Sequence, residues 1–391
     1  MNQEIHRIIM MGCLVLVLGS MTGCQRQAAW FGDLQGDRIR SLVTDELAKG
    51  SFPGAVILVG QHKTILFKEA FGLQMIDPNE VPMNTDTVFD LASMTKPMAT
   101  GASVMVLIDQ GNLKPDDYVK QYLPAFACAG KETVQIRHLL THTSGLPAYT
   151  NAKTLADQHG NPCAQAVVDT ICGLEAQNAP GERIRYSCLG YIILAQIIQQ
   201  VSGQDINVFA TENLYGPLRM KHTRFRPPDA WIDNVAATEV VEGTCIRGTV
   251  HDPLARLREG LSGNAGLFST ADDVARFCQM LLNKGRAKRR AILSEEAVHL
   301  MTEPQSHGRG FGFDLASSYA WITGDHASDR TFCHSGYTGT SVVCDPVSGI
   351  YLIILTNRAH PHDKGTVRAL RKGVANIVFG AHHELTPKTN D

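Results

Sequence analysis

The 391-residue sequence is low in charge and has no extended basic run. Lys and Arg number 36 against 38 Asp and Glu, the formal charge is -2, and charged residues make up 19% of the chain. A nucleic-acid-binding surface is therefore not expected. The short basic cluster RAKRR at residues 286–290 is interpreted as a solvated loop. With 44% apolar residues, the composition is that of a globular chain, long enough for one large domain or two smaller ones.

Metal-binding patterns are also scarce. No Cys-x-x-Cys pair occurs among the ten cysteines, which argues against a structural zinc site. His138 and His142 have helical i,i+4 spacing but no convincing third ligand. We therefore expect neither a metal nor an organic cofactor. If the chain turns at residues 338–339 as a hairpin, Cys333 and Cys344 lie opposite each other and form a candidate disulfide, which a one-residue change of register would remove.

The N-terminal segment predicts export. MNQEIHR is followed by the apolar run IIMMGCLVLVLGSM, which is too short for a membrane span and is typical of a signal peptide. The run ends in MTGC, which resembles a bacterial lipoprotein signal. We expect residues 1–23 to be removed, Cys24 to be lipidated, and the mature chain to be anchored to a membrane in the periplasm or cell envelope. Ordinary secretion is the alternative, because Met21 fits the lipoprotein pattern less well than Leu.

Strand signals lie at both ends of the chain and helical signals in the middle. After a linker at residues 24–36, a helical pattern precedes two β-rich runs at residues 54–72. Short β-branched runs return after HSGYTG and precede a closing helical pattern. This order predicts an α/β domain from residues 37–97 and 305–391, interrupted by a mainly helical domain at residues 98–304.

The stretch FDLASMTKPMAT places Ser93 and Lys96 three residues apart. On a helix these positions share a face, so the Lys96 amine can reach the Ser93 hydroxyl and act as its base if its pKa is lowered by burial and neighbouring charge. The motif taken alone also fits a serine helix cap followed by a solvated lysine. The remaining motifs must separate these interpretations.

Two further motifs carry candidate residues. In RIRYSCLGY, Tyr186 lies where a loop meets a helix and can present its hydroxyl as a proton carrier, although a buried structural tyrosine fits as well. In HSGYTGTS, the small residues Ser335 and Gly336 leave room for a substrate along a strand edge. The backbone N–H groups of Tyr337 and Ser93 could then hold an oxyanion. An ordinary hairpin is the alternative for this stretch.

Together and in this order, the motifs resemble the serine β-lactamase and penicillin-binding-protein superfamily, whose signature is Ser-x-x-Lys, Tyr-x-Asn and Lys/His-x-Gly. The resemblance is to the class C and esterase-like branch. It covers nearly all of the expected exported chain, including FPGAVILVG, IRHLLTHTSGLP, GLSGNAGLFSTADDVARF and DPVSGIYLIILTNR. It implies a β-lactamase-like α/β (α+β) fold, in which an antiparallel sheet built from both termini is flanked by helices and carries a mainly helical insert.

The resemblance also implies roles for residues. Ser93 would be the acylated nucleophile, Lys96 its base and Tyr186 the proton shuttle, while His334 replaces the commoner lysine of the third motif. A histidine would make the binding of a substrate carboxylate more dependent on pH. One position departs from the pattern: Cys188 stands where the family has Asn, and a thiol is a weaker hydrogen-bonding group. Cys188 could also join a disulfide or, less readily, act as a second nucleophile.

The sequence thus predicts a serine hydrolase that forms an acyl-enzyme on Ser93. Its substrate would be a small molecule or peptide, such as cell-wall peptide, an ester or a β-lactam. Because of His334 and Cys188, peptidase or esterase activity is favoured over β-lactamase activity. The alternative is a slow or inactive protein that binds cell-wall peptide or β-lactam without turnover.

Overall fold

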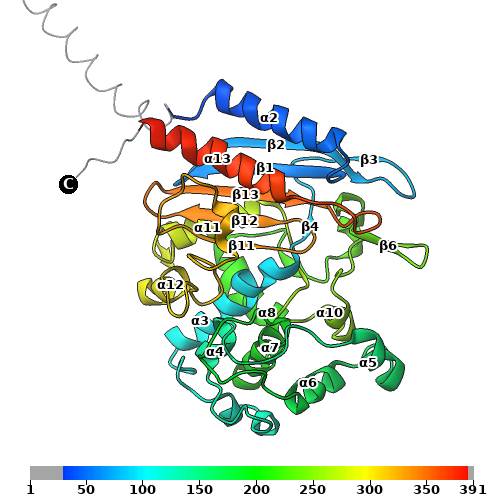
Figure 1. Ribbon diagram of the computed structural model, residues 1–391, viewed down its shortest axis with the longest axis vertical. Coiled ribbons are helices and arrows are strands. Elements are labelled where there is room, and N and C mark those ends of the chain that lie inside the picture. The colour runs from blue at the N-terminus through cyan, green and yellow to red at the C-terminus, as the bar shows by residue number, and fades with distance from the viewer. Residues whose placement is uncertain (1–29, 386–391) are drawn as a thin grey trace, which may run out of the picture.

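The computed structural model describes residues 30–385 and contains a six-stranded antiparallel sheet beside a larger, mainly helical region (Figure 1). The N-terminal strand β1 pairs directly with the C-terminal strand β13, so both ends of the chain build one sheet. From edge to edge the strands are β11 (Phe332–Ser335), β12 (Ser341–Asp345), β13 (Ile350–Thr356), β1 (Gly54–Gln61), β2 (Thr64–Met75) and β3 (Val81–Pro82).

Alternate side chains of the central strands enter two different cores, because successive residues of a strand point to opposite faces. On β1, Ile57 packs with the outer helices α2 (Asp33–Ala48) and α13 (Arg368–Leu385), whereas Leu58 faces the helical region. Figure 1 shows both helices covering the outer face of the sheet. Burial of both faces explains why β1 is apolar at nearly every position.

The inner face of the sheet is covered by α11 (Ala271–Leu282), which contacts β1 and β13. The other helices of this region are α3 (Ala102–Asp109), α4 (Ile136–Leu140), α5 (Ala152–His159), α6 (Ala164–Gly173), α7 (Cys188–Ser202), α8 (Ile206–Ala210), α9 (Gly216–Leu218), α10 (Pro253–Leu257) and α12 (Glu295–Thr302). The smaller sheets comprise β4 (Phe89–Asp90), β8 (Leu267–Ser269) and β5 (Arg224–Phe225); β6 (Glu239–Val241) and β7 (Thr244–Ile246); and β9 (Arg286–Ala287) and β10 (Arg290–Ala291).

The expected fold class is confirmed: an antiparallel sheet from both ends of the chain is flanked by helices and carries a mainly helical insert. The exact domain boundaries stay a prediction, since α11 lies within residues 98–304 yet packs on the sheet. The expected signal peptide and Cys24 lie outside the described residues. Within residues 30–385, no helix has both the length and the apolarity needed to cross a membrane.

The candidate disulfide between Cys333 and Cys344 is wrong by one residue of register. Cys333 pairs with Val343, and Cys344 pairs with Phe332. Because neighbouring positions on a strand point to opposite faces, Cys333 packs in the outer core and Cys344 in the inner core. All eight cysteines among the described residues are free, so Cys188 does not join a disulfide either.

We therefore expect Cys333 and Cys344 to remain unlinked and to resist alkylation until the protein unfolds. Iodoacetamide labelling of the native, non-reduced protein should modify the exposed Cys128, which serves as the internal control, and should spare the two sheet cysteines. Labelling in denaturant without reductant should then modify both. A disulfide-linked peptide containing Cys333 and Cys344 would contradict the register.

Candidate active site

Ser93 and Lys96 are brought together as the motif predicts. Ser93 lies in a 3-10 turn (Ala92–Met94) directly after β4, and Lys96 begins a π-helical stretch (Lys96–Gly101) that continues into α3. Lys96 Nζ donates hydrogen bonds to Ser93 Oγ at 2.9 Å and to the backbone oxygen of Asn264 at 3.0 Å. Lys96 is completely buried whereas Ser93 is half-buried, so Ser93 keeps some contact with solvent that Lys96 lacks.

The turn that carries Ser93 is fixed by its neighbours. Ala92 has a φ of 46°, a left-handed conformation that is uncommon for a residue with a side chain and that tends to occur at functional sites. The buried carboxylate of Asp90 holds this turn by accepting hydrogen bonds from the N–H groups of Ala92 at 2.8 Å and His251 at 2.7 Å. Burial raises the pKa of Asp90 despite these two hydrogen bonds.

Tyr186 lies beside the Ser93–Lys96 pair. Its ring centroid is 5.1 Å from Lys96 Nζ, and the ring stacks on His142 with centroids 4.2 Å apart. His142 is itself fixed, because its Nδ1 accepts a hydrogen bond from the backbone N–H of Ser187 at 3.1 Å. Burial raises the pKa of the Tyr186 hydroxyl, although the Lys96 ammonium opposes this shift.

Cys188 begins α7, is half-buried and lies beside Lys96. Its sulfur interacts with Lys96 and with the side-chain amide of Asn264, and burial raises the pKa of the thiol. The Asn264 side chain is anchored through its Oδ1, which accepts from Ser262 Oγ at 2.7 Å. Its Nδ2 finds no conventional hydrogen-bond acceptor within residues 30–385. A thiol with a raised pKa is a poor nucleophile.

The charge state of Lys96 reflects two opposing effects. Burial lowers the pKa of the Lys96 ammonium, whereas its interactions with Cys188 and Tyr186 raise it, and the net shift of the pKa is upward. Lys96 is therefore protonated in the resting site at neutral pH. It can take a proton from Ser93 only when its own proton has moved within the group that it forms with Tyr186 and Cys188.

The end of β11 is bound to the turn that carries Ser93. Thr338 Oγ1 donates to the backbone oxygen of Asp90 at 2.7 Å, and Thr340 Oγ1 donates to that of Leu91 at 3.0 Å. A Cβ atom on Gly336 would lie 2.4 Å from the Leu91 oxygen, so glycine is needed for this close approach. The two expected oxyanion donors, Ser93 and Tyr337, thus belong to segments that are directly joined.

A pocket of about 310 Å³ opens above Ser93. Most of the expected site residues line it, whereas Lys96 and Cys188 are not among its lining residues. The lining consists of Ser93, Tyr186, Asp314, Tyr319, His334, Ser335, Gly336, Tyr337, Arg358 and Arg371. The Tyr337 side chain is 55% exposed and stacks on His251, with ring centroids 5.5 Å apart.

His334 is buried, and neither of its ring nitrogens has a hydrogen-bond partner within the described chain. Burial lowers its pKa well below the ordinary value of 6.5, and the positive charges of Arg309 and Lys96 lower it further. His334 is therefore neutral at physiological pH. His334 is protonated only at acidic pH, and any effect of its protonation on the binding of a substrate carboxylate is expected there.

Sequence reasoning missed two buried arginines near the pocket. Arg309 pairs with Asp314 and lies 5.9 Å from the Tyr186 ring centroid, while its Nε and Nη2 have no partner within residues 30–385. Arg371 Nη2 donates to the backbone oxygens of Gly336 at 3.1 Å and Thr340 at 2.7 Å. Neither arginine belongs to a motif with recognisable spacing, so only the tertiary fold reveals them. No group of three or more His, Cys, Asp or Glu in the described part of the chain could hold a metal ion.

Comparisons with known proteins agree with this geometry. The family model described as Beta-lactamase matches residues 39–376. An "N-acetylmuramyl-L-alanine amidase" from Bacillus subtilis (strain 168) is 31% identical, covering 85% of this chain and 83% of the relative. A "Putative D-alanyl-D-alanine carboxypeptidase" from Escherichia coli (strain K12) is 30% identical, covering 79% of each chain. The chain therefore belongs to the Beta-lactamase family.

Solved structures with low sequence identity share the fold. The hydrolase EstCE1 aligns with a TM-score of 0.72 at 23% identity, covering 88% of this chain and 98% of that one. A penicillin-binding protein homologue from Caulobacter crescentus aligns with a TM-score of 0.70 at 20% identity, covering 90% and 98% respectively. The predicted resemblance to β-lactamase-related and penicillin-binding proteins is confirmed.

The close approach at Gly336 predicts that Gly336→Ala impairs the site. The added methyl group must push the end of β11 away from Leu91, which displaces the Tyr337 N–H relative to Ser93. Small displacements of reacting groups can cost about a hundredfold in rate, so we expect kcat/KM for a p-nitrophenyl ester to fall by about ten- to a hundredfold. Gly173→Ala at the end of α6 is the matched control, because its Cβ would meet nothing within 4 Å. Equal activity of the two variants would contradict a functional need for the close contact between Gly336 and Leu91.

The buried neutral histidines predict acid sensitivity. His142 and His334 have pKa values lowered chiefly by burial, so below about pH 6.5 the unfolded chain binds protons that the folded protein does not. Each histidine should reduce the free energy of unfolding by about 1.4 kcal/mol per pH unit until its own folded pKa is reached. Between pH 7 and pH 5, the free energy of unfolding measured by urea denaturation should fall less steeply for His334→Gln than for the unmodified protein. The exposed His159→Gln is the control, and an unchanged slope in His334→Gln would refute a neutral His334.

Proposed function

We propose that this member of the Beta-lactamase family is a serine hydrolase that forms an acyl-enzyme on Ser93. The observation that carries the proposal is the 2.9 Å hydrogen bond between Lys96 Nζ and Ser93 Oγ at the base of an open pocket, with Tyr186 beside it. A Ser hydroxyl needs a neighbour that removes its proton. Lys96 can take this proton when it passes one of its own protons to Tyr186. The alternative interpretation of the motif, a serine helix cap followed by a solvated lysine, is disfavoured by the complete burial of Lys96.

The proposed reaction has two steps. In the first, Ser93 Oγ forms a bond to the substrate carbonyl carbon while its proton passes through Lys96 and Tyr186 to the leaving amine or alcohol. The N–H groups of Ser93 and Tyr337 stabilise the negative oxygen of the tetrahedral intermediate. In the second step, water attacks the acyl carbon, the ester bond to Ser93 breaks, and the same residues return the proton to Ser93.

The substrate that we favour is a peptide of the cell wall or a small ester. The names of the two relatives refer to an amidase and to a carboxypeptidase, and the hydrolase EstCE1 shares the fold. Arg371 lines the pocket and its Nε has no partner within residues 30–385, which suits a substrate carboxylate. β-Lactamase activity is less favoured, because His334 is neutral and Cys188 replaces the amide of the family motif.

The second candidate function is a slow or inactive binding protein for cell-wall peptide or β-lactam. Cys188 favours it, because a thiol holds Lys96 and a substrate amide less firmly than an asparagine would. In that case Ser93 would be acylated but the acyl group would leave slowly. The two candidates therefore differ in the second step rather than the first.

The N-terminal segment supports a proposal on location. Its short apolar run and the MTGC sequence favour export, with Cys24 lipidated and the protein held at a membrane of the cell envelope. This location would bring the site to cell-wall substrates.

Replacement of the nucleophile tests the proposal. We expect Ser93→Ala to abolish hydrolysis of a p-nitrophenyl ester and to prevent any mass increase with a fluorophosphonate or fluorescent penicillin. Ser41→Ala, at an exposed position of α2, is the matched control and should behave like the unmodified protein. Hydrolysis that persists in Ser93→Ala would place the nucleophile elsewhere. In the unmodified protein, a transient adduct indicates an enzyme and a lasting adduct indicates the slow binder, whereas no adduct with any probe rejects both.

A further inference from the structure

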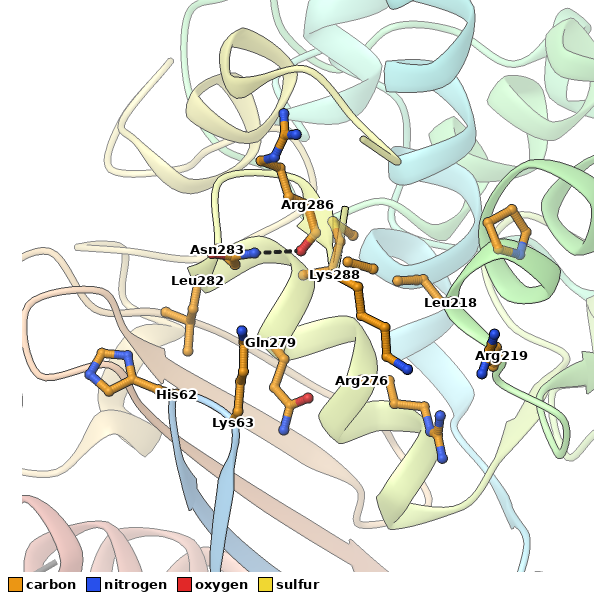
Figure 2. Close-up of a pocket in the computed structure, with 13 residues that line it drawn as sticks. His62, Lys63, Leu218, Arg219, Arg276, Gln279, Leu282, Asn283, Arg286 and Lys288 are labelled. Atoms are coloured by element: carbon orange, nitrogen blue, oxygen red, sulfur yellow. Dashed lines mark hydrogen bonds between the residues drawn. The ribbon is translucent and has the colours of Figure 1, made fainter. Parts of the chain in front are cut away.

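A second pocket, of about 380 Å³, lies between α9, α11, the β1–β2 turn and the β9–β10 hairpin (Figure 2). It shares no lining residue with the pocket above Ser93. Its apolar lining comes from Pro217, Leu218, Met280, Leu282 and Ala287. Leu218 and Met280 are almost completely buried, so the pocket has a firm apolar floor.

Cations from four separate segments surround this floor. Lys63 lies in the β1–β2 turn, Arg219 follows α9, Arg276 projects from α11, and Arg286 and Lys288 belong to the β9–β10 hairpin. No Asp or Glu lines the pocket in the described part of the chain. Because the whole chain has a formal charge of -2, this concentration of positive charge is a local feature and does not reflect composition.

The protein itself offers little compensation for these charges. Arg276 has one counter-charge, an ion pair with Asp273 in which Nε lies 3.6 Å from Oδ1, a distance too long for a direct hydrogen bond. Asp273 Oδ2 already accepts hydrogen bonds from the His222 N–H and the Thr223 hydroxyl. Within residues 30–385, Lys63, Arg219 and Lys288 form no ion pair. Like charges gathered without counter-charges repel one another, and a bound anion would relieve this repulsion.

The two pocket-lining basic side chains of the β9–β10 hairpin point in different directions. In Figure 2 the Lys288 side chain extends towards Arg276, whereas the Arg286 guanidinium points away from the pocket. Asn283 Nδ2 donates to the backbone oxygen of Arg286 at 2.8 Å and thereby ties the hairpin to the end of α11. This bond holds Lys288 near the arginines. Guanidinium groups bind phosphate in a bidentate manner, and a lysine adds a point charge.

We propose that this pocket binds a phosphate-type oxyanion through Arg219, Arg276 and Lys288, with Lys63 at its rim. The apolar floor would accept a hydrocarbon group attached to the phosphate. A lipid headgroup and free inorganic phosphate share the oxyanion and differ in the attached chain. Tighter binding of the lipid is expected, because only a lipid carries a hydrocarbon chain that can bury apolar surface against the apolar residues lining the pocket.

Calorimetric titration of the full chain with two soluble probes tests the proposal. One probe is inorganic phosphate, and the other is dihexanoyl phosphatidylglycerol below its micelle concentration. We expect saturable binding of the lipid, weakened at high salt because exposed charges are screened. Arg219→Glu combined with Lys288→Glu should weaken binding at least tenfold. Equal affinity for the two probes would assign the pocket to free phosphate, and tighter lipid binding would assign it to a headgroup.

Lys114→Glu combined with Lys120→Glu is the matched control, since both residues are exposed and neither lines the pocket. It changes the net charge equally and should leave binding unchanged. Thermal unfolding provides a second readout: phosphate should raise the Tm of the unmodified protein but not that of the pocket variant. Hydrolysis of the ester should be unaffected in both. Binding that is absent in the unmodified protein, or that weakens equally in the two double variants, would overturn the proposal.

Discussion

The burial of the Lys96 ammonium is the constraint on which the site depends. A buried charge without partners destabilises a protein by about 3–5 kcal/mol, so the fold must surround this group with polar atoms. Ser93 Oγ and the Asn264 backbone oxygen accept its hydrogen bonds, while the Tyr186 ring lies close to it. These groups come from separate segments of the chain. A single cation therefore requires several distant loops to occupy fixed positions.

Close approach of the backbone makes this arrangement possible. The loop that presents Asn264 lies against α7, and a Cβ on Gly263 would come within 1.9 Å of the Tyr191 backbone oxygen. Thr100 Oγ1 donates to the Gly263 oxygen at 2.7 Å and ties the same loop to the π-helical stretch after Lys96. A larger residue at position 263 would move the Asn264 oxygen away from the ammonium. Position 263 therefore requires a glycine because the Asn264 oxygen must reach the Lys96 ammonium.

The sequence predicted local chemistry better than it predicted tertiary relations. Spacing of three residues was sufficient to place Lys96 against Ser93, because an i,i+3 contact depends only on the local backbone. The pairing of Cys333 failed because strand register depends on both faces of the sheet, and a shift of one residue reverses them. The order of strand and helix patterns predicted an α/β domain built from both ends of the chain with a helical insert, and the family resemblance added the antiparallel, β-lactamase-like arrangement of its sheet.

Contacts between distant segments explain most of what was missed. His142 was rejected as a metal ligand, but its spacing gave no sign that it stacks on Tyr186 and accepts a hydrogen bond from Ser187. Asn264 lies in a segment that the resemblance included, but its contact with Lys96 depends on how that loop folds. The basic cluster at residues 286–290 was interpreted as a solvated loop, because its sequence gives no sign that Lys288 lines a pocket together with Arg276. A local sequence pattern does not show which charged side chains from distant helices and loops lie beside it in the fold.

The electrostatics of the candidate active site suit the anionic substrate that we propose. Lys96, Arg309 and Arg371 bring positive charge close to the pocket, and this charge helps to keep His334 neutral. The carboxylate of Asp314 offsets part of it through its pair with Arg309. A substrate carboxylate near Arg371 would supply further compensation and would be bound before Ser93 reacts. In the proposed reaction, the charge of Lys96 and the binding of the substrate carboxylate would belong to one electrostatic balance. Because His334 is neutral, the arginines would make the contact with the carboxylate.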